Sequence, residues 1–315
     1  MKALFMLVAA VMLTVSPAMA AEKKIPITIA SASSGGAWYP LGGAIAEMFK
    51  QNIPNSITSV GPGGGISNIF SVSANKAQMG FGFPADIHNA IAGKDEFDGK
   101  PIANIRAVTA LYPGILHIAT RPDKGINSIE DLKGKTLCVQ QRGNTAEKMA
   151  RVVLMAYGMS YDDLRKVNYV SFSEAADLIK DGHADALAYM STFPYPAMQD
   201  LAESAGVKLL PIDDAHIATL LETSPGFNAY DIPAGAYKGM TEPVQAIEAT
   251  TILFTNAEMP EEVVYQMTKT IYENREKLIL VNKSMAAMTG ETGHKVGGVE
   301  LHPGAIRYFK EIGAL

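Results

Sequence analysis

The sequence predicts an α/β fold made of two lobes with largely parallel sheets, on the basis of three observations. Apolar runs of strand length alternate with helical segments along the whole chain, which is typical of strand–helix–strand units. The chain has 315 residues, a length that suits two lobes better than one. Two similar α/β units are visible, one continuous in the middle of the chain and one assembled from both ends.

Such an arrangement requires the chain to cross between the lobes twice. We expect the crossings near 112–116 and near 230–236. The resulting division is a signal peptide at 1–20, a discontinuous lobe 1 at 21–114 plus 234–315, and lobe 2 at 115–233. A cleft between two α/β lobes is a common place for a small ligand.

The chain begins with the features of an export signal. Lys2 is followed by an apolar run over 3–15 and by Ala18-Met19-Ala20, which predicts a signal peptide cut after Ala20. The apolar run is about half as long as a membrane span. A lipoprotein anchor would need a cysteine at the cut, and the only cysteine is Cys138. We therefore expect a free protein in the periplasm.

The first lobe is expected to begin with three strand–turn–helix units. The strands are predicted at 25–32, 57–60 and 78–83, and the helices at 40–51, 66–75 and 85–92. Pro40 suits a first helical position because the N–H that proline lacks would be unpaired there.

The middle of the chain continues the same alternation. Strands are predicted at 106–111 and 115–121, on either side of Tyr112-Pro113-Gly114. A strand around Cys138, a helix to Tyr157, a strand at 168–171, a helix at 173–180 and a strand at 184–190 follow. The chain returns through 246–255 and ends in two helices that are broken near 290–304.

Composition excludes several classes of function. The formal net charge is −5 for the whole chain and about −6 without the signal, which argues against nucleic acid and anionic membranes as main partners. A single cysteine excludes an internal disulfide and cysteine-rich metal sites, and Cys138 lies in an apolar run typical of a buried, inert thiol. The six histidines lack zinc-binding spacing. We expect no metal, no cofactor and no catalytic constellation.

Three strand-to-helix turns are candidates for ligand binding: 33–39, 61–65 and 142–145. Small residues let the backbone approach a ligand, and the following helix offers free N–H groups and a positive dipole end. Any one such turn could be purely structural. Trp38 and Tyr39 could equally belong to the core or to a pocket wall. Arg142 could be a solvated charge beside Glu147, or a guanidinium fork for a carboxylate.

Several stretches resemble the TAXI family (TRAP-associated extracytoplasmic immunogenic proteins) of solute receptors across essentially the whole mature chain. They are SGGAWYPLGGAIA at 34–46, the glycine turn leading to Asn68, ALYP at 110–113, SIEDLKGK at 128–135, SFSEAA at 171–176 and LHPGAIRYFK at 301–310.

The resemblance implies a periplasmic-binding-protein type II fold, with hinge strands between the lobes and the ligand in the cleft. It also implies delivery of a small carboxylate, such as glutamate or 2-oxoglutarate, to a TRAP-type permease driven by an ion gradient. We expect a monomer that does not bind nucleic acid. The expected ligand-binding residues are Ser33, Ser34, Gly36, Trp38, Tyr39, Gly63, Gly64, Gly65, Phe83, Asp86, Arg142, Gly143, Asn144, Thr145 and Ser191.

The chain departs from the family pattern at two turns. Gln140-Gln141-Arg142-Gly143-Asn144 stands where the family has mostly Gly and Ser, and Phe83 stands where a polar side chain is common. Two other classes of function remain open. A ligand sensor that reports to a membrane kinase would share these features, and an enzyme on the same fold would need a catalytic residue that the sequence does not reveal.

Overall fold

The strands form one mixed sheet that runs through the molecule. The computed structural model describes residues 24–33, 35–224 and 226–315, so the expected signal peptide and Ser34 lie outside the described residues. The strand order is β2-β1-β3-β10-β4-β7-β5-β6, with β8 paired to β4 and β9 paired to β10. The strands are β1 (Ile25–Ala30), β2 (Ser56–Gly61), β3 (Met79–Gly82), β4 (Ile105–Thr120), β5 (Thr136–Val139), β6 (Lys166–Tyr169), β7 (Ala186–Ser191), β8 (Lys208–Leu209), β9 (Asn228–Ile232) and β10 (Val244–Asn256).

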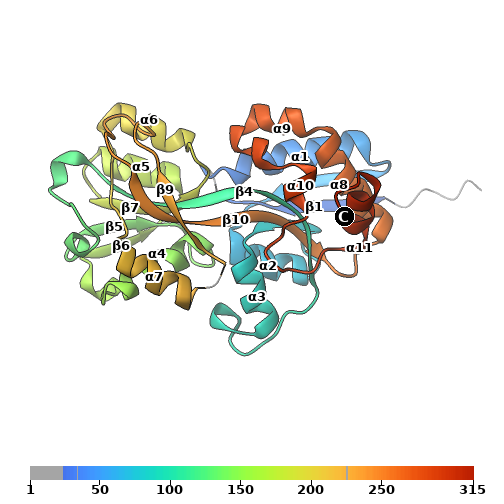
Figure 1. Ribbon diagram of the computed structural model, residues 1–315, viewed down its shortest axis with the longest axis horizontal. Helices are drawn as coiled ribbons and strands as arrows, with labels where there is room; N and C mark the ends of the chain where they lie inside the picture. Colours follow the sequence, from blue (N-terminus) through green and yellow to red (C-terminus); the bar gives the residue numbers. More distant parts are fainter. Residues whose placement is uncertain (1–23, 34, 225) are drawn as a thin grey trace, which may run out of the picture.

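Helices cover both faces of this sheet in each of two lobes (Figure 1). Lobe 1 carries α1 (Trp38–Asn52), α2 (Gly65–Ser73), α3 (Pro84–Ala92), α8 (Glu261–Glu273), α9 (Arg275–Val281), α10 (Gly290–Gly293) and α11 (Pro303–Glu311). Lobe 2 carries α4 (Thr145–Ala156), α5 (Phe172–Lys180), α6 (Pro196–Ala205) and α7 (Asp214–Thr223). Short 3-10 turns are η1 (Asp95–Phe97), η2 (Pro122–Lys124), η3 (Glu130–Leu132), η4 (Tyr161–Asp163) and η5 (Lys283–Ala287).

Two long antiparallel strands, β4 and β10, connect the lobes (Figure 1). The sequence predicted two strands separated by a turn at 112–114, but β4 is continuous from Ile105 to Thr120. Pro113 lies opposite Thr250, next to a register shift in the ladder. Proline is tolerated in a sheet at such an irregularity because its missing N–H does not break a regular hydrogen bond.

The chain returns to lobe 1 later than expected. The segment 230–236 contains the end of β9, which pairs with Val244–Glu248 of β10. Ile232, Tyr237 and Ala246 pack in one apolar cluster with Ile115 and Leu187 of lobe 2. The return crossing therefore lies within β10. The position of the crossing strand does not show which residues move together when the lobes separate. The division into lobes at 114/115 and 233/234 therefore stays a prediction.

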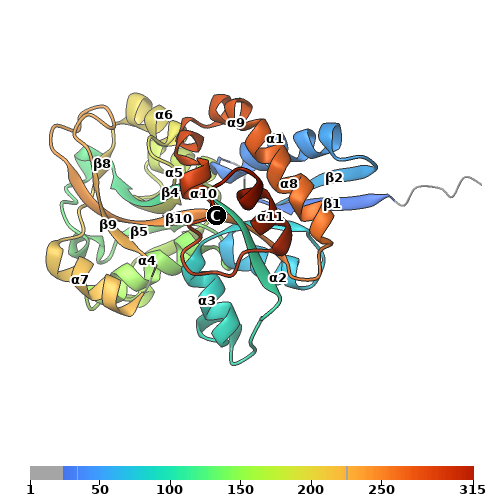
Figure 2. The ribbon, with the colours of Figure 1, turned by 45° about the vertical axis from the view of Figure 1, so that its right-hand side comes forward.

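Each lobe has its own apolar packing. In lobe 1, Ile27, Ile45 and Leu253 lie in a fully buried cluster with α1 and α8, and α11 packs on α8 at the outer end of the lobe through Tyr265, Tyr308 and Phe309 (Figure 2). In lobe 2, Cys138 is buried, as predicted, and burial raises the pKa of its thiol to about 11. The apolar residues of helices and strands thus form a buried core in each lobe.

None of the helices in the described part of the chain is long and apolar enough to cross a membrane.

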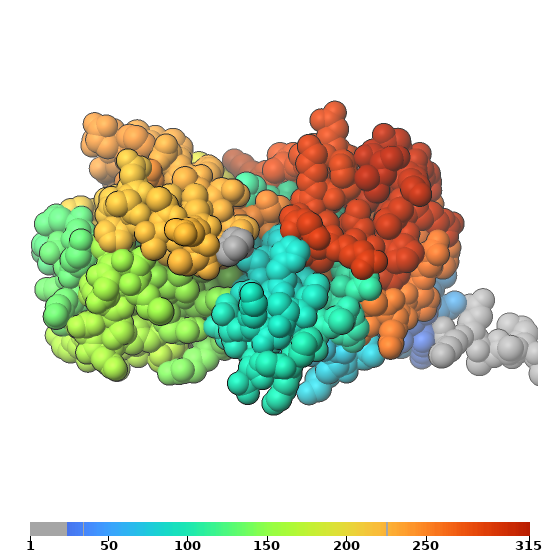
Figure 3. Space-filling view, turned by 60° about the horizontal axis from the view of Figure 1, so that its bottom comes forward, coloured from blue at the N-terminus to red at the C-terminus, as the bar shows by residue number. Residues whose placement is uncertain are grey.

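The two lobes touch on both sides of the crossing strands. On one side, Tyr195 of lobe 2 donates a hydrogen bond to the Gly35 carbonyl (2.6 Å), and Ser284 of lobe 1 donates to the Phe193 carbonyl (3.1 Å). On the other side, the N–H of Ser67 donates to the Gly143 carbonyl (2.9 Å), and the segment around α3 lies against lobe 2 (Figure 3). The molecule is therefore in a closed arrangement.

Candidate ligand-binding site

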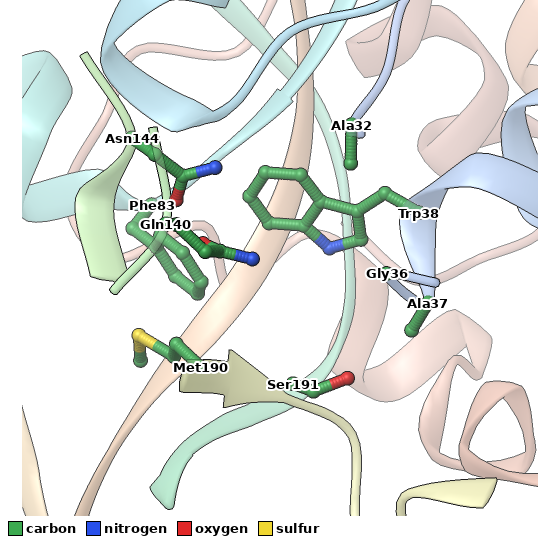
Figure 4. Close-up of a pocket in the computed structure, with 9 residues that line it drawn as sticks. All are labelled: Ala32, Gly36, Ala37, Trp38, Phe83, Gln140, Asn144, Met190 and Ser191. Carbon is green, nitrogen blue, oxygen red and sulfur yellow. The ribbon is translucent and has the colours of Figure 1, made fainter. Parts of the chain in front are cut away.

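A small cavity lies between the lobes, close to where β1, β3, β5 and β7 end. Its walls come from the β1–α1 turn, from the residue before α3, from the β5–α4 turn and from the end of β7 (Figure 4). Ligands of open α/β sheets bind at the carboxyl ends of strands, which is where this cavity lies. The lining residues are Ala32, Gly36, Ala37, Trp38, Phe83, Gln140, Asn144, Met190 and Ser191.

The closed cavity is small. The space open to the centre of a water-sized sphere is about 20 Å³, close to what one water molecule requires. A ligand of several atoms therefore needs the lobes to separate before it can enter.

Aromatic rings form the lobe 1 wall of the cavity. Trp38, the first residue of α1, stacks on Phe81 with ring centroids 5.6 Å apart and lies 5.3 Å from the ring of Phe83. Its side chain also packs against apolar residues of both lobes. The pocket-wall interpretation of Trp38 therefore fits its position, although the ring also contacts the core.

The N-terminus of α1 faces the same cavity. Ala37 precedes the helix without a side-chain cap, and the first turn has no acidic residue. By contrast, α4 is capped, because the side chain of Asn144 accepts a hydrogen bond from the N–H of Ala146 (3.1 Å). The N–H of Tyr39 donates to the Gly36 carbonyl (3.2 Å) and Pro40 has no N–H, so the start of α1 attracts an anion mainly through the positive end of the helix dipole.

Polar side chains from lobe 2 complete the cavity. The amides of Gln140 and Asn144 point toward the Trp38 ring (Figure 4). The hydroxyl of Ser191, although close to Tyr195, makes no hydrogen bond of normal geometry within the described residues, and Ser191 is only 8% exposed. A buried hydroxyl without a partner costs free energy, so Ser191 is suited to a ligand or a water molecule.

Two further buried hydroxyls without hydrogen-bond partners lie near residues of the cavity wall: that of Ser33 in the β1–α1 turn, and that of Thr251 on β10, near Phe83. The Tyr112 hydroxyl on β4 lies close to the Trp38 side chain. Native interiors leave few such groups unpaired. Together with Ser191, the hydroxyls of Ser33 and Thr251 give this part of the molecule groups that can bond a ligand or a water molecule.

Charged side chains do not line the cavity among the described residues. Arg142 in particular lies on the ring of Tyr169, with its guanidinium carbon 4.5 Å from the ring centroid, and donates a hydrogen bond to the Tyr169 hydroxyl (3.0 Å). Tyr39, the neighbour of Trp38, is 53% exposed. Contact of either side chain with a ligand stays a prediction that would require a rearrangement.

We expect Arg142→Ala to change ligand affinity by less than about 0.5 kcal/mol, as is typical of a surface substitution. The reason is that the guanidinium has a partner in Tyr169 outside the cavity. Calorimetric titration of the variant checks this. A guanidinium fork on the ligand, the alternative interpretation of the sequence, would instead give a loss of about 10- to 150-fold, with only partial recovery in Arg142→Lys.

The glycine turn before α2 contacts lobe 2 in place of lining the cavity. A Cβ at Gly65 would lie 1.9 Å from Thr145 Oγ1, and one at Gly64 would lie 2.2 Å from the Asn144 amide nitrogen. The sequence predicted that these glycines allow close approach of a ligand. In the closed arrangement they allow close approach of the β5–α4 turn.

Asp86 lies behind Thr145, in a cluster of charges that joins the lobes. Thr145 Oγ1 donates to Asp86 Oδ2 (2.6 Å), and the ammonium of Lys148 lies 3.6 Å from the same carboxylate. Lys148 also contacts Asp95 (2.7 Å) and Glu96 (3.4 Å) of lobe 1. Burial raises the pKa of Asp86, although Lys148 and Thr145 lower it. Burial lowers the pKa of Lys148, but its three carboxylate partners outweigh this and raise it overall.

The structure brings five of the predicted site residues to the cavity wall: Gly36, Trp38, Phe83, Asn144 and Ser191. Gly63, Gly64, Gly65, Asp86 and Thr145 lie next to it at the lobe contact, and Gly143 accepts the Ser67 N–H there. Reasoning from the sequence missed Ala32, Ala37, Gln140 and Met190. The position of Gln140 directly after a buried strand, at its carboxyl end, was a usable signal.

The described residues show no cluster of three or more His, Cys, Asp or Glu side chains arranged to hold a metal ion. His117 illustrates how the histidines are used. It is fully buried on β4, bonded to the Ile115 carbonyl (2.9 Å) and to the Tyr237 hydroxyl (2.8 Å), and burial lowers its pKa to about 4. This pattern is that of a structural histidine.

Solved structures with a similar fold include proteins of transport systems. One is described as a periplasmic transporter, with 16% identity over 93% of this chain and 94% of that chain and a TM-score of 0.57. Another is the periplasmic binding protein BugD, with 15% identity over 92% and 94% and a TM-score of 0.55. A putative L-cystine ABC transporter from Listeria monocytogenes has 12% identity over 83% and 96% and a TM-score of 0.50. These similarities confirm the predicted two-lobed periplasmic-binding-protein fold.

A family model provides the closer assignment. It is described as the NMT1-like family and matches residues 29–313, which cover both lobes, all ten strands of the sheet except the start of β1, and every residue of the cavity wall. The chain therefore belongs to the NMT1-like family.

Proposed function

We propose that the protein is an extracytoplasmic solute receptor that closes over a small organic anion and delivers it to a membrane permease. The resemblance to the TAXI family extends the proposal to a TRAP-type permease and to a monomer in the periplasm after cleavage behind Ala20. The single observation that carries the proposal is the cavity between the lobes, with its uncapped helix N-terminus and unpartnered buried hydroxyls.

Chemistry favours binding over catalysis at this cavity. Its described lining residues include one hydroxyl, Ser191, and no histidine, lysine or carboxylate that would act on it as a base. A sensor would use the same cavity, and a permease gene next to the gene of this protein would separate transport from sensing.

Binding is expected to depend on closure of the lobes. A cavity with walls from both lobes shields a ligand from water only when they meet. Gly65 of lobe 1 lies against Thr145 of lobe 2, so we expect this contact to be lost when the lobes separate.

We expect the ligand to reduce the radius of gyration in small-angle scattering. Gly65→Ala should keep the larger radius at saturation, because its Cβ would meet Thr145 on closing. Gly43→Ala, in an exposed position of α1 with open space around it, is the matched control and should close like the wild type. An unchanged radius in the wild type would contradict the closure mechanism.

The chain supplies its own reporter for a ligand screen. Trp38 is the only tryptophan and lies in the cavity wall, so ligand binding should change its fluorescence. Thermal shift provides a second readout, since a ligand at about 100 times its dissociation constant stabilises the native state by roughly 2.7 kcal/mol. If amino acids, mono- and dicarboxylates and neutral solutes all fail in both assays, the receptor proposal is wrong. Product formation detected by mass spectrometry would indicate an enzyme instead.

A further inference from the structure

The charge of the cavity wall restricts the ligand further than the fold does. The wall combines aromatic and thioether surface from Trp38, Phe83 and Met190 with neutral polar groups from Gln140, Asn144 and Ser191. Among the described residues, the wall thus offers one electropositive feature, the start of α1, and no formal charge of either sign.

From this wall we infer that the ligand is a short monocarboxylate without an ammonium group, with its carboxylate at the α1 N-terminus and Ser191 and its carbon chain against Trp38 and Phe83. The inference rests on the proposed receptor function and narrows it. It departs from the amino acids and dicarboxylates that the resemblance implies.

An α-ammonium group would lack an anionic partner in this cavity. Two carboxylates beside the β5–α4 turn are already engaged: Asp86 accepts from Thr145 and contacts Lys148, and Glu147 is bound by Arg151 (3.0 Å) and by the Tyr161 hydroxyl (3.2 Å). A third, Glu248, accepts from Asn228 through one oxygen (2.8 Å) and lies two strands away from Ser191 in the sheet. A buried charge without a partner is costly, so an amino acid should bind worse than the hydroxy acid of the same shape.

A second carboxylate would likewise lack a cation. Lys148 is shared among three carboxylates, Arg151 binds Glu96 (2.9 Å) as well as Glu147, and Arg142 lies on Tyr169. One helix N-terminus carries roughly half a positive charge and suits a single carboxylate.

Three compounds, two of which differ from the first by a single group, test the inference, each titrated into the protein while the Trp38 fluorescence is followed. Lactate is the reference, alanine replaces its hydroxyl by an ammonium, and malate adds a second carboxylate; pyruvate, propionate, glutamate and 2-oxoglutarate complete the series. We expect lactate, pyruvate or propionate to bind, and alanine and malate to bind at least about tenfold more weakly.

Other binding results would overturn the monocarboxylate inference, and they show whether the proposed receptor function fails with it. Tighter binding of alanine, malate, glutamate or 2-oxoglutarate would overturn the inference and leave the receptor intact. If an ammonium is accepted, Glu248 is the first residue to examine, since its Oε2 is buried without a partner and Ile115 pairs with both Glu248 and Ser191. If only a neutral solute binds, the inference is wrong; if nothing in the wider screen binds, both are wrong.

Ser191→Ala tests the placement of the carboxylate. Removal of a hydroxyl that has no protein partner should leave stability unchanged or raised, whereas affinity for the monocarboxylate should fall about tenfold. A merely structural serine would not separate the two effects. Ser204→Ala, at an exposed position of α6 whose hydroxyl bonds the Asp200 carbonyl, is the control. Unchanged affinity in Ser191→Ala would contradict the proposed placement.

Discussion

Replacing Trp38 by alanine should weaken ligand binding by about 3 kcal/mol, roughly 150-fold, the size of effect found for aromatic anchors at the centre of a binding site. The ring forms part of the lobe 1 wall of the cavity, stacks on Phe81 and packs against the tilted ring of Phe83. Its loss would remove both the apolar surface for the ligand and the packing that holds Phe83 in place. Because this variant lacks the Trp38 fluorescence, its ligand affinity is measured by isothermal titration calorimetry.

Two variants separate the role of the ring from general damage. Trp38→Phe keeps an aromatic ring and should retain affinity within about tenfold, since a conservative apolar exchange costs roughly 1.5 kcal/mol or less. Tyr39→Ala removes the neighbouring exposed ring and should change affinity by less than about 0.5 kcal/mol. If Trp38→Ala bound as tightly as the wild type, the cavity would not be the ligand site. A large loss of affinity in Tyr39→Ala would place the ligand nearer the surface, in agreement with the prediction from the sequence that Tyr39 binds the ligand.

Lys148→Met should weaken ligand binding by about 2–3 kcal/mol, roughly 30- to 150-fold, by destabilising the closed arrangement. The side chains of Lys148 and Asp86 are 11% and 2% exposed, and removal of one partner of a buried ion pair leaves the other charge uncompensated. Separation of the lobes returns Asp86 to water, so the cost falls on closure and lowers the apparent affinity. Thr145 still donates to Asp86 in the variant, and Asp95 is half exposed, so we expect less than the full cost of an isolated buried charge.

A double-mutant cycle identifies the origin of that loss. Asp86→Asn with Lys148→Met removes both charges and should recover much of the affinity, because replacing both partners is far less costly than removing one. Lys50→Met is the control, since Lys50 is 65% exposed and pairs only with the exposed Glu47. Calorimetry gives the affinities and scattering the degree of closure. Equal losses in the single and double variants would mean that the pair does not stabilise the closed state.

Much of the fold was predictable because the position of a helix or strand depends largely on residues close together in the sequence. The burial of α1 and α5 follows their apolar periodicity, and Ser171 with Glu174 forms the capping box that starts α5. The interruption predicted at 112–114 was wrong because the ladder to β10 carries Pro113 through a register shift. No signal within the segment itself reveals a partner strand that lies more than 130 residues away in the chain.

The candidate site was predictable in part. Gly36, Trp38, Phe83, Asn144 and Ser191 line the cavity because Ser191 ends a strand and the others lie in the turns that follow strands, and the ends of parallel strands meet at one edge of a sheet. Arg142 has the same kind of sequence position. Its long side chain packs on the Tyr169 ring. Whether Arg142 contacts a ligand or this ring depends on three-dimensional distances that cannot be read from positions in the sequence.

The sequence by itself determined the class of the fold, most strands and helices of its first half and the turns that face the cleft, because the local pattern of apolar residues and turn chemistry act over a few residues. Only the tertiary structure decided what those turns contact. It placed Gly65 against Thr145, Asp86 beneath Lys148, and a cavity wall without formal charge around Trp38. Such relations join residues about 60 to 160 positions apart, and they depend on how the two lobes meet, which no local pattern specifies.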